Sequence, residues 1–383
     1  MAGHNAPLVW VDCEMTGLDA QNDTIIEIAC IVTDTELNIL ERGESIVIHQ
    51  PAAVMDAMGD WCKEHHGASG LTQSVLASTV TMADAEAAVL ALVKRHCSEP
   101  GRAVLAGNSV HVDRMFLSRL MPELVGFLHY RIVDVSSVKQ LARYWNPRLL
   151  GSAPAKTESH RALDDIVESI NELRYYREHF FVVPARLPLL QRASVHSTQG
   201  TAPLVWIDVE TTGLVADKDV ILEVAMVVTD GALEPLGPEL SLVVGQPAAQ
   251  LRKLNAWSRK WHQQSGLLAE VARSPLTVGE AERRLLAQIT AVCPAPNRAV
   301  LAGSNVGFDR AFIARHMPVL AGHLHYRNVD VSTVNELAKR WAPDALRGLE
   351  KRHAHRALDD VRESLRELRF YRDALFRAPA PRG

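Results

Sequence analysis

The chain contains 383 residues and carries a formal net charge of −4. This length is sufficient for two or three domains with cores of their own. The negative charge argues against a protein that coats long nucleic acid, because such proteins bind through many phosphate contacts. A nucleic-acid substrate, if there is one, should therefore be short.

The cysteines and the apolar runs indicate in which cellular compartment the protein is expected. Of the five cysteines, four fall in the first half of the chain and one in the second, which does not fit a disulfide framework. They are interpreted as small hydrophobic residues in a reducing environment. No apolar run approaches about 18 residues, and the first predicted strand begins at Leu8, so neither a membrane span nor a secretory leader is expected. These features predict a cytoplasmic protein that does not contact membranes.

The predicted elements begin with strands and continue with alternating helices and strands. Apolar or alternating runs predict three strands, at 8–14, 24–34 and 38–50. Further along, the pattern predicts a helix at 82–97, a strand at 103–109, a helix at 112–121, a strand at 131–135, a helix at 136–145 and a long helix at 161–180. This order predicts an α/β fold with a mixed β-sheet flanked by α-helices.

The same text then occurs a second time. LVWVDCEMTGL at 8–18 matches LVWIDVETTGL at 204–214, an offset of 196, and RAVLAG, HYR and HRALDD also occur twice. The chain is a tandem duplication of one α/β domain. We expect a first domain at 1–182, a linker rich in Pro, Ser and Thr at 183–202, a second domain at 203–378 and a disordered tail at 379–383.

Acidic residues stand where predicted elements of each copy begin or end. Asp12 and Glu14 alternate along the first strand, so both carboxylates point to one face of the sheet. A lone pair of this kind is usually a solvated strand end. Here Asp113 follows the strand at 103–109, and Asp165 lies near the start of the last helix, so that three elements converge on one crevice. For the adjacent Asp164, a simple interaction with the helix dipole is the preferred interpretation.

The second copy serves as an internal control. Sequence around these positions has diverged, as in PAAVMDAMGD at 51–60 against PAAQLRKLNA at 247–256, yet the four acids recur as Asp208, Glu210, Asp309 and Asp360. Four oxygen ligands from separate elements suit Mg²⁺ or Mn²⁺, and two such ions stabilise displacement at a phosphodiester. His160 and His355 precede the last acid of each set by five residues, in the loop that enters the helix, and are predicted to act as general bases.

DCEMTGL, GNSVHVDR, HYR and HRALDD together resemble the oligoribonuclease family, DEDDh-type 3′→5′ exonucleases of the ribonuclease H-like fold. The resemblance runs through nearly all of both halves and implies two tandem ribonuclease H-like domains. It also implies hydrolysis of very short single-stranded RNA, chiefly dinucleotides, to 5′-nucleotides with two divalent metal ions per site.

The resemblance further implies a set of substrate contacts. Leu18 and Leu214 would wedge between two bases, Trp61 and Trp257 would stack on a base, and His66 and His262 would approach a phosphate or sugar. Periodicity alone favours core packing for each Leu and Trp. Ser109 and its counterpart Asn305 are further candidates for phosphate contact, through a hydroxyl in one copy and an amide in the other.

The HYR element stands before a predicted helix with a basic and hydroxyl-bearing set suited to a terminal phosphate. The resemblance implies that Tyr and Arg of this element complete the site of a partner subunit. We therefore expect an intramolecular pseudo-dimer without an obligatory protein partner. The residues concerned are Tyr130, Arg131 and Ser136 in the first copy and Tyr326, Arg327 and Ser332 in the second.

Three alternatives remain open at this point. One is a DEDDh exonuclease that acts on DNA ends, which the HYR motif and Trp61 disfavour. Another is a nucleotide-binding regulator that retains the acids without catalysis. The third is a fusion in which only one half is active.

Overall fold

The computed structural model describes residues 6–154, 161–182, 201–349 and 356–377, and everything below refers to them. The predicted linker at 183–202 lies outside this set except for its last two residues, and the predicted tail at 379–383 lies outside it entirely. The chain divides into two units. Unit 1 contains Met1–Val138, Gly151–Val183 and Asn335–Pro343, and unit 2 contains the remaining residues.

The first sheet is mixed, with strand order β3-β2-β1-β5-β6 and with β4 also paired to β2. The central strand β1 runs antiparallel to β2 and parallel to β5, which is parallel to β6. The strands are β1 (Leu8–Met15), β2 (Ile25–Thr33), β3 (Ile39–Arg42), β4 (Ile46–Val47), β5 (Val104–Gly107) and β6 (Ile132–Asp134). A mixed sheet of this topology confirms the predicted fold class.

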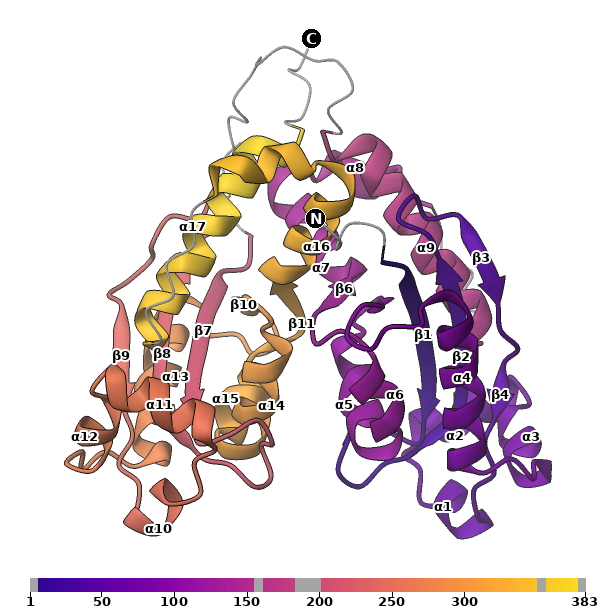
Figure 1. Cartoon of the computed structure of the whole chain (residues 1–383), viewed down its shortest axis with the longest axis horizontal. Coiled ribbons are helices and arrows are strands. Elements are labelled where there is room, and N and C mark those ends of the chain that lie inside the picture. Colours follow the sequence, from indigo (N-terminus) through magenta and orange to yellow (C-terminus); the bar gives the residue numbers. More distant parts are fainter. Residues whose placement is uncertain (1–5, 155–160, 183–200, 350–355, 378–383) are drawn as a thin grey trace. The chain divides into compact units, whose positions relative to one another are not determined.

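Helices flank this sheet (Figure 1). Helix α9 packs on β1 and β2, and α4 packs on β2 and on α6. The helices of the first copy are α1 (Ala52–Asp56), α2 (Asp60–Ala68), α3 (Leu71–Ala77), α4 (Met82–His96), α5 (His111–Leu120), α6 (Pro122–Phe127), α7 (Val135–Trp145), α8 (Arg148–Gly151) and α9 (Ala162–His179). The long predicted helices therefore lie within one or two residues of their observed bounds.

The second sheet repeats this topology with strand order β11-β10-β7-β8-β9. Its strands are β7 (Leu204–Thr211), β8 (Ile221–Thr229), β9 (Leu240–Val243), β10 (Val300–Gly303) and β11 (His325–Asp330). The helices are α10 (Ala248–Leu251), α11 (Ala256–Gln264), α12 (Leu267–Val271), α13 (Val278–Val292), α14 (Gly307–His316), α15 (Pro318–His323), α16 (Val331–Trp341), the 3₁₀ helix η1 (Pro343–Gly348) and α17 (Ala357–Leu375).

Each core includes a fully buried strand that follows the first strand of the copy and pairs with it. All nine residues of β2 and of β8 are buried, which matches their nearly continuous apolar sequence. A buried tryptophan on the neighbouring strand locks the pair: Trp10 Nε1 donates to Thr33 at 2.9 Å, and Trp206 repeats the bond to Thr229 at 3.0 Å. The first two of the repeated acids thus lie on a strand that is paired along its length with a fully buried neighbour.

The predicted third strand at 38–50 is not continuous. It is interrupted between β3 and β4 at Gly43, whose N–H donates to the carbonyl of Cys30 at 2.9 Å. A side chain at this position would place its Cβ 2.8 Å from that carbonyl oxygen, so the close approach requires glycine. The run was wrongly predicted as one strand because alternation of side chains does not reveal such a break.

No single helix among the described residues is long and apolar enough to cross a membrane. Helices α3 and α4 pass a test of length and composition only when taken together, and they meet at a bend of 105°. The apolar face of α4 includes Val89 and Val93, which are buried in the core of the first unit.

Candidate active site

The site of the first copy begins on β1, where Asp12 and Glu14 alternate along the strand. Helix α9 crosses this strand and contributes Asp165 from its first turn. Carboxylate oxygens of these three residues lie within 4.8 Å of one another, and Asp208, Glu210 and Asp360 form the same group in the second copy. The structure therefore brings together strand and helix carboxylates that are about 150 residues apart in the sequence.

Asp113 and Asp309 join the sites from a third element. Each lies in the first turn of its helix, α5 or α14, and is nearly fully buried. Asp113 Oδ1 accepts a hydrogen bond of 3.0 Å from the N–H of Cys13, and Asp309 Oδ1 accepts one of 2.9 Å from the N–H of Val209. Both partners lie between the two acids of the central strand, so the fourth carboxylate is fixed beside them.

A tight turn delivers this helix to the site. Ser109 and Asn305, which precede α5 and α14, adopt positive φ values of 53° and 56°. Asp134 Oδ1 accepts hydrogen bonds from the N–H groups of Ser109 and Ser136, both at 2.9 Å. Asp330 makes the equivalent bonds in the second copy, at 2.9 and 2.8 Å. A buried aspartate at the end of β6 or β11 thus stabilises the turn that positions the fourth acid.

Burial, with some repulsion between neighbouring acids, raises the pKa values of several carboxyls of each site. Burial, followed by repulsion from Asp165 and Glu27, raises the pKa of Glu14 from 4.5 to about 8. Burial and repulsion from Asp360 and Glu223 raise the pKa of Glu210 to about 8 in the same way. Burial also raises the pKa of Asp113 to about 7 and that of Asp309 to about 8. Without a cation, these carboxyls therefore keep their protons at pH values where an ordinary carboxyl is charged.

This chemistry fits a hard divalent cation. The sets contain only carboxylate oxygens, which Mg²⁺ and Mn²⁺ prefer, and their mutual repulsion would be relieved by positive charge among them. The residues that would hold the ions in the first copy are Asp12, Glu14, Asp113 and Asp165, and those in the second are Asp208, Glu210, Asp309 and Asp360. His160 and His355 lie outside the described residues, although the residues that follow them, Arg161 and Arg356, lie beside the acids.

His66 and His262 occupy the same position in both copies. Each is almost fully buried and bonds through Nε2 to a backbone carbonyl of the acidic strand, at Met15 or Thr211, at 3.0 Å. The Nδ1 atoms lie 4.0 Å from Glu14 and 3.8 Å from Glu210. In this structure each histidine therefore supports the acidic strand. Its predicted approach to a phosphate or sugar stays a prediction.

The predicted base contacts are exposed. Leu18 is 82% exposed and Leu214 is 75% exposed, while Trp61 and Trp257 are 57% and 59% exposed. The alternative that these side chains are core residues is therefore wrong. A large apolar side chain that recurs on the surface of both units is suited to contact a ligand. The aromatic neighbour differs: Trp61 stacks on His65 at 3.9 Å, whereas Trp257 lies 6.3 Å from Trp261.

The HYR elements hold their tyrosine rings on the surface. Tyr130 is 57% exposed, stacks on His129 at 4.6 Å, and lies 5.4 Å from the guanidinium of Arg131. Tyr326 and Arg327 repeat the arrangement with His325. Within unit 1, Arg131 also donates to Asn335 at 3.0 Å and to Glu336 at 3.1 Å. Its guanidinium therefore already has an anionic partner in this unit.

The serine pair of the first copy is preformed. Ser109 Oγ and Ser136 Oγ are 3.0 Å apart, and Ser136 Oγ donates to Asn108 at 3.1 Å. In the second copy Asn305 stands at the position of Ser109, so this hydroxyl pair cannot form there, although Ser332 matches Ser136.

Two buried acids next to the clusters were missed in the sequence. Glu27 and Glu223 are fully or almost fully buried on β2 and β8, and each stands directly opposite the glutamate of the acidic strand, Glu14 or Glu210. The signal was present, since a single acid recurs at the same place in two otherwise apolar strands, IIEIACIVT and ILEVAMVVT.

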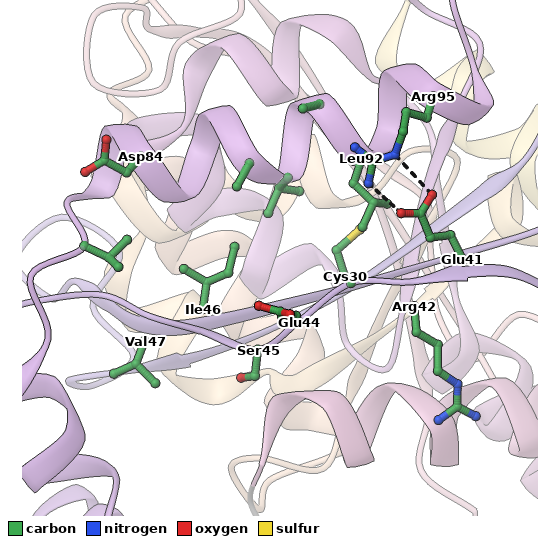
Figure 2. A pocket seen from close by; sticks show the side chains of 15 residues that line it. Cys30, Glu41, Arg42, Glu44, Ser45, Ile46, Val47, Asp84, Leu92 and Arg95 are labelled. Atoms are coloured by element: carbon green, nitrogen blue, oxygen red, sulfur yellow. Dashed lines mark hydrogen bonds and ion pairs between the residues drawn. The ribbon is translucent and has the colours of Figure 1, made fainter.

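A separate hollow of about 750 Å³ lies between α4 and the β3–β4 segment (Figure 2). Glu41 forms an ion pair with Arg95 at its margin. None of the clustered acids lines it. The ion pair is also not repeated, because Gly237 replaces Glu41 in the second copy. This hollow is therefore not part of the duplicated site.

Comparison with known proteins agrees with this geometry. The family model of RNase T-type exonucleases, described as Exonuclease, matches residues 9–173 and again 205–368. A human mitochondrial oligoribonuclease is 55% identical over 174 residues, which are 45% of this chain and 73% of that protein. The oligoribonuclease of Streptomyces griseus is 54% identical over 199 residues, 52% of this chain and 98% of its own. That of Marinobacter nauticus is 53% identical over 174 residues, 45% of this chain and 96% of its own.

Each of these relatives corresponds to about half of the chain, whereas the family model matches twice. The two sheets with their repeated acid clusters are the two matched segments. The chain therefore belongs to the oligoribonuclease family of DEDDh-type exonucleases and is a 3′→5′ exoribonuclease with two tandem ribonuclease H-like domains.

Proposed function

We propose that both halves hydrolyse short single-stranded RNA, and dinucleotides above all, to nucleoside 5′-monophosphates. The observation that carries this proposal is the recurrence of one acid cluster in both units, together with an exposed Leu and an exposed Trp that recur in each copy. One exposed Leu and one exposed Trp per copy suit contacts to a ligand of very few bases. The net charge of −4 also disfavours a long polyanion.

Two Mg²⁺ or Mn²⁺ ions per site complete the proposal. They would be held by the four acids of each copy, and when bound they would polarise the phosphodiester and stabilise the charge that develops on it. His160 and His355 take the proton from the attacking water. Their position in the sequence, immediately before the N-cap residues Arg161 and Arg356 of α9 and α17, supports this role.

The substrate is bound by side chains of the same chain. Leu18 and Leu214 separate two bases, while Trp61 and Trp257 stack on one base, a contact worth about 1–3 kcal/mol. Their exposure supports these roles. Further contacts to phosphate or sugar come from His66, His262, Ser109, Asn305, Ser136 and Ser332.

The two copies act as an intramolecular pseudo-dimer in this proposal. Tyr326 and Arg327 serve the site of the first copy, and Tyr130 and Arg131 serve that of the second. The composition of the units supports it, because unit 1 includes Asn335–Pro343 from the second copy. Within unit 1, Trp341 donates to Thr35 at 2.9 Å, and within unit 2, Trp145 donates to Gly231 at 2.9 Å. Tethering two mutually dependent sites keeps them at roughly millimolar effective concentration.

The domain bounds of 1–182 and 203–378 belong to the proposal as well. So does a cytoplasmic location, which is supported by the five cysteines, all of them free thiols in the structure. No protein partner is required for activity if the pseudo-dimer is correct.

The decisive experiment is turnover of an RNA length series by the purified chain with Mg²⁺ or Mn²⁺, beside the matching DNA oligomers. We expect dinucleotides to be hydrolysed fastest and activity to fall with length. Faster turnover of DNA ends would favour the DNA-directed alternative, and metal-dependent binding without product would favour a regulator. Asp113→Ala and Asp309→Ala variants would show whether only one half is active.

A further inference from the structure

The residue that follows each predicted catalytic histidine makes a salt bridge beside the acid cluster. Arg161 donates through Nη2 to Oε1 of Glu27 at 2.9 Å, and Arg356 donates through Nε and Nη2 to both oxygens of Glu223 at 3.0 Å. The glutamates are fully or almost fully buried. A buried glutamate directly opposite Glu14 or Glu210 requires a positive partner, because like charges across a sheet repel.

These arginines also begin the helices that carry the last acid. Arg161 is the N-cap of α9, and its carbonyl accepts the N–H of Asp165 at 3.1 Å. The carbonyl of Arg356 likewise accepts the N–H of Asp360 at 3.0 Å. The side chain is thus fixed to β2 or β8 while the backbone fixes the helical acid. Strand and helix carboxylates are joined through one residue.

The two copies differ in how firmly this residue is held. In the second copy Arg356 donates Nη1 and Nη2 to both oxygens of Glu270 on α12, each at 3.0 Å, and Glu223 also accepts the N–H of Ala357 at 3.3 Å. Ser74 stands at the position of Glu270 in the first copy. There the described residues offer no hydrogen-bond partner to Arg161 Nε or to Glu27 Oε2.

We infer that Arg161 and Arg356 are positioning residues that set the separation between the helical and strand carboxylates, and that Glu270 makes the second site the better organised of the two for a divalent cation. This inference rests on the proposed metal-dependent function. A site whose ligands are already fixed loses less conformational freedom on binding. Partners that orient metal ligands commonly change metal affinity by about 10–100-fold.

The test measures Mn²⁺ binding directly, by calorimetry on the full chain. Asp12→Asn with Glu14→Gln leaves the second site as the binding site, and Asp208→Asn with Glu210→Gln leaves the first. In the former background we expect Glu270→Ser to weaken Mn²⁺ binding about tenfold. In the latter, Ser74→Glu should strengthen it by a similar factor.

Two further variants separate positioning from charge. Glu270→Gln removes the charge but keeps one acceptor, so positioning predicts an affinity between those of the parent and of Glu270→Ser. Glu234→Ser is the matched control, since Glu234 also faces an arginine of α17, Arg369 at 3.9 Å, but lies beyond the far end of β8. It should leave Mn²⁺ affinity unchanged.

Every outcome decides between the ideas. If Glu270→Ser lowers the melting temperature but leaves the Mn²⁺ affinity unchanged, the salt bridge between Arg356 and Glu270 is purely structural and the inference is overturned. Glu270→Gln as damaging as Glu270→Ser would assign the effect to charge and overturn it too. If the parent chain binds Mn²⁺ but Glu270→Ser and Ser74→Glu have no effect on its affinity, the inference is overturned and the proposed function stands. A parent that binds no Mn²⁺ at either cluster overturns both.

Discussion

The carboxylate of Asp113 accepts a hydrogen bond of 3.0 Å from the backbone N–H of Cys13. In the second copy Asp309 makes the same bond to Val209 at 2.9 Å. The acid is therefore fixed to the strand by a backbone contact that any residue except proline at position 13 supplies. The thiol itself is buried, and burial raises the pKa of Cys13 well above its usual value, so that it remains protonated.

We therefore predict that Cys13→Val leaves dinucleotide turnover within about twofold of the parent, since the second copy already accommodates valine at the matching position. Asp113→Ala in an Asp309→Ala background should instead lower turnover at least about a hundredfold, because a ligand to the cations is lost. Steady-state kinetics with circular dichroism as a folding control would check both. A severe loss in Cys13→Val would give the thiol a role that its position does not suggest.

The raised pKa values of the acid clusters predict how stability depends on pH. Glu14 has a pKa of about 8 in the fold against an ordinary value of 4.5, and Glu210 is similar. A carboxyl whose folded pKa is raised contributes stability that is fully present below about pH 4.5 and is lost as the pH rises through about 8. The metal-free chain should therefore melt at a lower temperature at about pH 8.5 than at about pH 5.5.

Mn²⁺ should reverse this trend, because cations bind the charged carboxylates and release their protons. Melting curves with chelator or with Mn²⁺ at the two pH values would measure the effect. Glu14→Gln with Glu210→Gln is the control. It should flatten the pH dependence of the metal-free chain and reduce stabilisation by Mn²⁺. Equal melting temperatures for the metal-free parent at both pH values would contradict the electrostatic account.

Much of this fold could be predicted from sequence because the two copies check each other. The acids at 12 and 14 lie on a strand whose pattern is unambiguous, and the last helix begins within one residue of the predicted Arg161. Short elements were less predictable. Helices such as α1 and α3 have too few residues for a helical period to emerge, and the break at Gly43 depends on a contact with Cys30 across the sheet.

The clustering of the acids could be predicted from the sequence, but the contacts that hold them in place could not. Asp12, Glu14 and Asp165 were expected to meet, and they do. The burial of His66 against Met15 and Glu14 could not be inferred, because spacing from Trp61 does not tell which face of α2 is covered. The exchange of Asn335–Pro343 into unit 1 depends on packing between distant segments, which no local pattern encodes.

The pseudo-dimer proposal predicts a crossed effect of the two tyrosines on turnover. In an Asp309→Ala background only the first site turns over, so Tyr326→Phe should lower turnover about tenfold or more while Tyr130→Phe should not. The Asp113→Ala background should give the reverse. The hydroxyl is the group removed, and the ring keeps its stacking on the neighbouring histidine, so folding should be unaffected. If each tyrosine affected the site of its own copy, the pseudo-dimer would be wrong.

The last prediction concerns the turn before α5, where Ser109 has φ of 53° and its counterpart Asn305 has φ of 56°. Asparagine adopts this left-handed conformation more readily than serine, so Ser109→Asn should not destabilise the fold. It removes the hydroxyl that lies 3.0 Å from Ser136, however. If this pair binds a terminal phosphate, losing a hydrogen bond to a charged group costs about 1.5–3 kcal/mol, or roughly 10–100-fold in affinity.

In the Asp309→Ala background, Ser109→Asn should raise KM for a 5′-phosphorylated dinucleotide and leave KM for the unphosphorylated one nearly unchanged. Asn305→Ser in the Asp113→Ala background should do the opposite, and equal effects on both substrates would show that the pair supports the turn without touching phosphate.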